Sequence, residues 1–564
     1  MSRMAASVPN VDPHAKSTWV WWVLPVLAAL AWYGVLSATA LNRVQSMNVT
    51  GSGSFAVFNQ IYWNYSQVGH FQQTIHAGYS DNWTWGGHRA PMLFVVSLLY
   101  GLAPEPITLC RIQIAALALG AFPAFGLGWR AFGRPLGGVA ALAMYLAYPP
   151  LQVLALSDYQ DIILGIPFAV LAVHQAWRGS PWGFALAILG VVCSREEWIL
   201  VAPFLGFLAP GGVRARLRWG VGGLAVVLFY FGILWSVAYN TGFHYSPSDA
   251  PSGSLREKLD IPGTWEASLD RARRILAPIP YVEVARQPEE ERVVTPSNPV
   301  AGGAPDLRNW EASWLGRREI TRTWKDVRGF YLDLGVPVHL VGVFAPAALI
   351  PAMGVLVVHL TAPLGQGVDS RWGEMVHHIS PLVALLVLAA ILGAGFCYRR
   401  TAARRGLWLF LAGVGALLVV QVNLDWGRHQ KLATWGRSAK APVPEWALVA
   451  GLPTEAILAT DMDASLIISS RPLAYTYDDS ILEKAPRRGL LAVEYLLVRR
   501  TSRGWVELAR DRHRASLIAE TPDYLLFRMP WVRPAHSPAA GPGAGPAANR
   551  PTEHPFGRTR STAP

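Results

Sequence analysis

The sequence predicts an α-helical polytopic membrane protein with about 10–12 hydrophobic passes, some of half length, and a small C-terminal α/β soluble domain. Apolar runs of roughly 20 residues, the length that crosses a bilayer core, recur through residues 18–426. Only 15% of the 564 residues are charged, against about 25% in soluble domains. The 24 tryptophans suit a chain with many membrane–water interfaces.

The net charge of +12 does not indicate a nucleic-acid-binding protein. The excess lies largely in short connections, around residues 214–218 and 399–405, where arginines mark cytoplasmic loops. No surface that combines aromatic and basic residues is visible, so we expect no nucleic-acid partner. The three cysteines lie in apolar runs and provide neither a disulfide framework nor metal-ligand spacing.

We expect residues 1–17 to be a cytoplasmic leader and the first span, 18–41, to be an uncleaved anchor. The aromatic loop 42–90 would then lie outside, as short helices on the membrane surface. Residues 91–102 are too short to span and would be re-entrant or interfacial. Further spans are predicted at residues 107–127, 136–156 (broken at Pro149-Pro150), 162–177, 221–239, 379–396 and 407–424.

Two regions leave the number of passes open. Residues 336–361 contain Pro346 and Pro351 and form either one span or a broken hairpin, and the hairpin better keeps the 399–405 arginines inside. The hydrophilic stretch 240–334 is a second outer loop, too long for an ordinary connection.

The C-terminal region has a different pattern. Residues 445–532 alternate short apolar runs and turns, which predicts an extracytoplasmic α/β domain with strands near 456–459, 490–498, 515–519 and 524–527. The last two strands would be joined at Thr521-Pro522-Asp523. The tail 533–564 is rich in Pro, Ala and Gly and cannot build a core.

Charges inside an apolar run are the strongest functional signal. Arg195, Glu196 and Glu197 interrupt residues 182–208, and an ionised carboxylate in hydrocarbon costs several kcal/mol. The run therefore either breaks at a membrane surface or lines a polar cavity. The alternative is structural: Arg195 pairs with a neighbouring acid and caps two short helices.

The order of several short motifs resembles a bacterial family of predicted membrane proteins, the domain of unknown function numbered twenty seventy-nine. The resemblance extends from Val44 to Met529. The motifs that carry it are Phe58-Asn59-Gln60 with Trp63-Asn64, His88 with Pro91, Gln113, Tyr148-Pro149-Pro150, Asp158-Tyr159-Gln160, Arg195-Glu196-Glu197, His377-His378 with Pro381, Ile457 to Thr460, Ser470-Arg471 and Tyr475.

That family is similar to integral-membrane glycosyltransferases of the C-type fold. The resemblance implies a polyprenyl-phosphate sugar as donor, chemistry on the outer side, and an acidic base in the first outer loop. Two positions depart from the family pattern: Ser54 stands where an aspartate is usual, and Gln160 where a histidine is usual. Asp81, in the same loop, could replace the missing base.

Glycosyl transfer needs a base for the acceptor hydroxyl and a positive group for the leaving phosphate. The expected catalytic residues are Asp158, Glu196, Asp81 and His88. The expected substrate- or phosphate-binding residues are Arg89, Arg195, Glu197, Gln60, Gln160 and His377. Asp158 fits a helix cap equally well. No metal ligands are assigned, although Mg²⁺ or Mn²⁺ could neutralise the phosphate.

These residues favour a glycosyltransferase-like protein at the outer face of the bacterial inner membrane. Its partners would be membrane lipid, a polyprenyl-phosphate sugar and an envelope acceptor. A transporter or lipid-handling protein would place similar charges along a path, but the chain shows no convincing symmetry between two halves. A non-catalytic envelope protein that lost its base is the third hypothesis.

Overall fold

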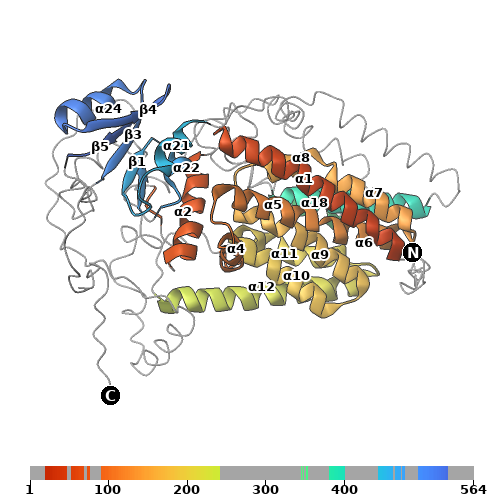
Figure 1. Ribbon diagram of the computed structural model, residues 1–564. Coiled ribbons are helices and arrows are strands. Elements are labelled where there is room, and N and C mark those ends of the chain that lie inside the picture. Colours follow the sequence, from red (N-terminus) through yellow and green to blue (C-terminus); the bar gives the residue numbers. More distant parts are fainter. Residues whose placement is uncertain are drawn as a thin grey trace, which may run out of the picture.

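The computed structural model describes residues 19–47, 52–68, 73–75, 90–241, 345, 347–348, 351–352, 380–400, 443–461, 464–471, 473–476 and 493–530. In this part of the chain a bundle of helices carries a small sheet domain at one end (Figure 1). The predicted fold class, a helical membrane protein with a C-terminal α/β domain, is confirmed.

Four helical segments of the described chain are long and apolar enough to cross a membrane. The first joins η1 (Trp19–Trp22) to α1 (Val23–Gln45), and the second joins α5 (Pro106–Leu119) to α6 (Ala121–Phe132). The others belong to α12 (Val213–Thr241) and α18 (Ser380–Arg400). The α18 span is the most enclosed, because its neighbours α6, α7 and α9 surround it.

Half-length helices complete the bundle, as the sequence indicates. The proline pair bends α7 (Pro135–Leu146) from α8 (Pro149–Leu156) by 51°, and the two together could make a fifth span. The 91–102 run forms only α4 (Met92–Tyr100). The remaining short elements are η2 (Asp161–Leu164), α9 (Gly165–Arg178), α10 (Pro181–Ser194), η3 (Glu196–Leu200), α11 (Ala202–Leu205) and η4 (Gly206–Leu208).

Two expectations about the membrane surface are wrong. The aromatic outer loop does form a helix, α2 (Ser52–Val68), but Phe55 and Tyr62 are 0% exposed and Phe58 is 3% exposed. Their apolar face meets α4, α5 and α22 (Ser465–Ile468) rather than lipid. The helix α12 also begins earlier than predicted, at residue 213, so the 214–218 arginines lie on its first turns and not in a loop.

The C-terminal domain is a five-stranded sheet in the order β2-β1-β3-β5-β4. Its parallel half contains β1 (Leu458–Thr460), β2 (Ala474–Thr476) and β3 (Tyr495–Arg499), and its antiparallel half β4 (Ser516–Glu520) and β5 (Tyr524–Arg528). Four of these strands and the turn after β4 match the prediction. One face packs against α21 (Glu445–Ala450) and α22, and the other against α24 (Arg503–Glu507) and η8 (Leu508–Arg512).

Two adjacent side chains of α2 join the bundle to the sheet domain. Gln60 Oε1 accepts hydrogen bonds from the backbone N–H groups of Thr74, at 2.7 Å, and Ile75, at 3.2 Å. Asn59 Nδ2 donates to Ser469 Oγ at 2.8 Å. Both side chains are 0% exposed, so the two amides of this polar joint are fully buried.

The segment that Gln60 holds extends the sheet edge. Thr476 of β2 donates its backbone N–H to the Ile75 carbonyl oxygen at 2.9 Å. A second connection runs from the Val443 N–H to the carbonyl oxygen of Gln45, at the end of α1. The sheet domain is therefore fastened to both α1 and the segment 73–75 that follows α2.

Replacing Gln60 with alanine should loosen this joint. The change leaves the Thr74 and Ile75 N–H groups without their acceptor, at a cost of about 1–3 kcal/mol. We expect faster hydrogen exchange at the Ile75 and Thr476 amides. Gln67→Ala, at the exposed end of the same helix, is the matched control. Equal protection of these amides from exchange in the two variants would show that Gln60 does not hold the sheet domain to α2.

Candidate functional site

The apolar run breaks at Arg195, as the charges predict. Helix α10 ends at Ser194, and Arg195 adopts an extended backbone with φ −170° and ψ 152°. The chain then restarts as the short helix η3, with Glu196 and Glu197 in its first turn. The extended Arg195 thus ends α10 before the charged residues, so that none of the three lies within it.

Arg195 is buried at the centre of the site, with only 2% of its side chain exposed. Its Nη1 lies 3.5 Å from Asp161 Oδ1, and its Nε lies 3.5 Å from Glu197 Oε2. Nη1 also donates a 3.4 Å hydrogen bond to Gln160 Oε1. Asp161 is 1% exposed, whereas Glu197 is 32% exposed. One arginine thus links a fully buried acid to an accessible one.

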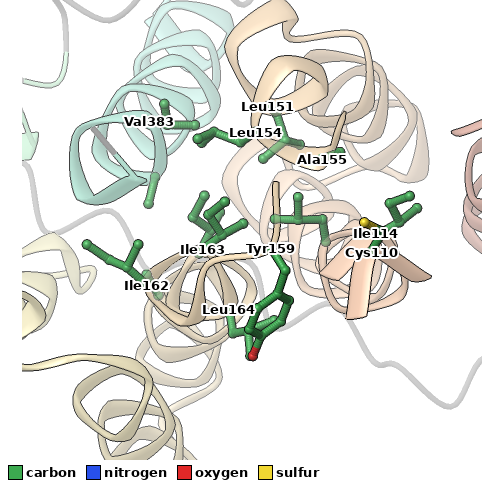
Figure 2. Close-up of a cluster of buried hydrophobic side chains, with 14 of the residues drawn as sticks. Cys110, Ile114, Leu151, Leu154, Ala155, Tyr159, Ile162, Ile163, Leu164 and Val383 are labelled. Atoms are coloured by element: carbon green, nitrogen blue, oxygen red, sulfur yellow. The ribbon is translucent and has the colours of Figure 1, made fainter. Parts of the chain in front are cut away.

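The segment that carries Asp161 runs through the middle of the bundle. Figure 2 shows Tyr159 and residues 162–164 between side chains of α5, α8 and α18. Gln113 of α5 fixes this segment: its Nε2 donates to the Ser157 carbonyl oxygen at 3.2 Å and its Oε1 accepts from the Gln160 N–H at 2.9 Å. An amide is suited to this task because it can donate and accept at once.

Trp198 closes the other side of the segment. Its Nε1 donates to the Ile162 carbonyl oxygen at 2.9 Å, and its side chain is 0% exposed. The indole lies over Gly165, where an added Cβ would come within 2.3 Å of the ring. The glycine therefore permits the close approach of η3 to the start of α9.

A second buried charge pair lies near the first. Asp158 is 7% exposed and Arg43, in the last turn of α1, is 6% exposed. The two charges attract each other, and both interact electrostatically with Cys110 of α5. The segment 157–161 therefore carries one acid toward α1 and another toward α10.

Helix α2 contacts the same segment through a tyrosine pair. The hydroxyls of Tyr62 and Tyr159 are 2.8 Å apart in a hydrogen bond, and their rings pack edge to face. Burial raises the pKa of both phenols, and the nearby Asp161 carboxylate raises it further. Both hydroxyls therefore stay protonated at any physiological pH and act as hydrogen-bonding groups only.

The structure brings together three of the residues predicted from the sequence: Gln160, Arg195 and Glu197. Asp158 lies two residues before Gln160 and interacts with Arg43 instead. Glu196 is half-buried beside them on η3. Gln60 instead lies in the joint with the sheet domain. Predicted residues outside the described chain are Asp81, His88, Arg89 and His377, and the side chain of Ser54 is likewise not described.

The alternative roles are partly resolved. Asp158 is not a helix cap. The cap positions of η2 and α9 are Gln160 and Leu164, and no side chain caps the first turn of either helix. The structural alternative for Arg195 is correct in one respect, since it does pair with acids. Its partner Asp161, however, comes from a segment 34 positions away and not only from its neighbour.

Sequence reasoning missed Arg43 and Asp161 as members of the site. We expected the first span to end at residue 41, which would put Arg43 in a loop, but α1 continues through Gln45. Asp161 was visible as a second acid after the proline break, three residues beyond Asp158. That spacing could have indicated two acids that serve different partners.

Within the described residues no group of three His, Cys, Asp or Glu side chains is placed to hold a metal ion. The acids of the site are instead arranged around arginines. Such an arrangement can keep carboxylates ionised in an apolar bundle. The Glu197 carboxylate, on a side chain that is 32% exposed, can accept a proton from a hydroxyl that reaches it.

Replacing Asp161 with asparagine keeps the shape of the side chain and removes its charge. Arg195 is then left with a buried, partly uncompensated charge, a loss of about 3–5 kcal/mol in stability. We expect a clearly lower melting temperature in detergent. The control is Glu520→Gln, which removes the exposed partner of Arg500 and should cost less than about 1 kcal/mol. Equal melting temperatures would argue against a central ion pair.

Comparison with known proteins finds a family match over part of the chain and several solved structures that resemble it. Solved structures of ArnT from Cupriavidus metallidurans, without ligand and bound to undecaprenyl phosphate, each share 13% identity over 90% of this chain and 97% of theirs, with a TM-score of 0.44. The oligosaccharyltransferase of Archaeoglobus fulgidus shares 11% identity over 85% of this chain and 70% of its own, with a TM-score of 0.40. No curated protein sequence matches the chain. Residues 43–246 match the family described as "Predicted membrane protein (DUF2079)", which confirms over these residues the resemblance indicated by the motifs.

Proposed function

We propose that the protein transfers a sugar from a polyprenyl-phosphate carrier to an envelope acceptor at the outer face of the bacterial inner membrane. The observation that carries the proposal is the Glu197 side chain, 32% exposed, whose carboxylate is held beside buried Arg195 at a break in an apolar run. Ionisable groups at such a depth mark functional sites. The family resemblance supplies the substrate class.

In this proposal Glu197 is the base, with Glu196 as the neighbouring candidate. The acceptor hydroxyl gives its proton to the carboxylate while its oxygen bonds to the anomeric carbon. The bond between that carbon and the phosphate oxygen breaks, and the electron pair leaves with the phosphate. Removing a proton in the transition state typically accelerates a reaction by about 10²–10⁴-fold.

Arg195 and Asp158 take different roles from those first expected. Arg195 is 2% exposed and already bound to two acids, so it is a positioning residue for Glu197. Asp158 is buried against Arg43 and positions the segment 157–161. Arg89 remains the candidate cation for the leaving phosphate, and the sheet domain would lie outside the cytoplasm, above the site.

Native mass spectrometry of the full-length protein, purified from its own membrane, tests the proposal. We expect wild type to carry polyprenyl phosphate and its sugar conjugate. Glu197→Gln should shift this mixture toward the sugar conjugate by at least about tenfold, because the loss of a base blocks turnover but not binding. Glu196→Gln shows whether the neighbouring acid contributes, and Glu520→Gln is the control on the sheet domain.

The other functions predict different spectra. A transporter or lipid-handling protein would retain the carrier lipid with the same ratio of conjugate to free phosphate in every variant. A non-catalytic envelope protein would carry only bulk phospholipid, unchanged by substitution. Either result would overturn the proposed transfer.

A further inference from the structure

The end of the bundle far from the sheet domain gathers arginines. Arg130 lies in the last turn of α6, Arg178 in the last turn of α9, and Arg399 near the end of α18, three helices that contact one another. Trp22, just before α1, packs against Trp129 at this end, with a centroid distance of 6.5 Å.

Helix α1 fixes the distance between this end and the sheet domain. The last residue of α1, Gln45, is bonded to the sheet domain, and its first turn lies at the arginine end. At 1.5 Å per residue the 23 residues of α1 extend about 35 Å, enough to cross a membrane core of about 30 Å. The arginines and the sheet domain therefore lie at opposite ends of a spanning helix.

Two helical faces meet beneath the arginines. On α9 His174 lies four residues before Arg178, and on α6 Gly126 lies four residues before Arg130, so each pair shares one face. The His174 ring packs directly on Gly126, where an added Cβ would come within 2.4 Å of Cε1. His174 is 7% exposed, and its Nδ1 has no hydrogen-bond partner among the described residues.

The arginines repel one another and find no acid in the described chain. The charges of Arg130 and Arg178 oppose each other, and both act on His174. The guanidinium of Arg399 lies 5.7 Å from the ring centre of Trp177, over the same end of α9. Like charges held together without a counter-charge are unfavourable unless an anion joins them.

The usual preferences of arginine in membrane proteins do not explain why Arg130, Arg178 and Arg399 gather at one end of the bundle. Arginines on the cytoplasmic side and at helix C-termini are common, but separate, solvated side chains satisfy both tendencies. Arg214 and Arg216, on the first turns of α12, are of that exposed kind. Arg178 is exposed as well, but Arg130 is half-buried, and the charges of both act on the buried His174 ring, whose Nδ1 has no hydrogen-bond partner among the described residues.

We propose that this end of the bundle binds the phosphate of an anionic phospholipid in the inner leaflet. Guanidinium groups suit a phosphate, and basic pockets between spanning helices bind lipid headgroups in this way. Phe396 of α18, one turn before Arg399, is 40% exposed and offers an apolar surface to an acyl chain. The ligand is distinct from the polyprenyl carrier, whose proposed site lies at the other end.

The test titrates delipidated full-length protein in neutral detergent with a phosphatidylglycerol, with native mass spectrometry as the readout. Arg130→Gln/Arg178→Gln should weaken phosphatidylglycerol binding at least about tenfold, since two charge-assisted hydrogen bonds are lost. Arg214→Gln/Arg216→Gln removes the same charge from α12 and should leave the affinity within about twofold. Equal weakening in both double variants would overturn the proposal.

Two further measurements keep the outcome clear. Arg130→Lys/Arg178→Lys retains the charge and guards against misfolding of the glutamine variant, and it should bind phosphatidylglycerol with an intermediate affinity. Competition with inorganic phosphate and with a zwitterionic phosphatidylcholine distinguishes a lipid headgroup from a soluble phosphate as the ligand. Weak competition by both supports a lipid headgroup, whereas displacement by millimolar phosphate would identify a soluble phosphate as the ligand and overturn the lipid assignment.

Discussion

The buried pair of Arg195 and Asp161 is the interaction on which the rest of the site depends. Neither charge would be stable alone in an apolar bundle, because the desolvation of a single ion costs several kcal/mol. Their pairing requires α10 to end at Ser194 and η2 to begin at Asp161, so that the extended Arg195 meets the first residue of η2. Gln113 and Trp198 then satisfy the backbone groups that these breaks expose. The polar site and the broken helices are consequences of the same constraint.

Helix α2 connects this site to the sheet domain. Its residue 59 binds Ser469 and accepts a 2.8 Å hydrogen bond from the Tyr100 hydroxyl, its residue 60 holds the sheet edge, and its residue 62 binds Tyr159. These contacts come from one buried helix of 17 residues. A shift of the sheet domain would therefore be felt at the segment that carries Asp161, without any intervening solvent. Helix α2 is thus a structural wall of the site, which explains why its aromatic residues face protein.

The sequence predicted features that follow from local chemistry. The charges at 195–197 predicted a broken run, the proline pair at 149–150 predicted a bend, and the Thr521 turn predicted a hairpin, because in each case the responsible residues are adjacent. Features that depend on distant partners could not be predicted. The three residues of β2 have little pattern of their own and form a strand through pairing with β1 and bonding to residues 74 and 75. Arg43 acquires its role only when Asp158 is brought to it from 115 positions away.

The bundle treats its charges differently at its two ends. Near the sheet domain, buried arginines are matched with acids, as Arg195 is with Asp161 and Glu197. At the other end, Arg130 and Arg178 gather with no described acid beside them. A protein that only had to fold could pair both sets or leave both solvated. Matched charges suit a site that must hold carboxylates ionised while a neutral hydroxyl approaches, and unmatched arginines suit a site completed by an anion from outside. The difference in charge pairing along α1 is therefore the structural reason for proposing separate chemistry at the two ends of the bundle.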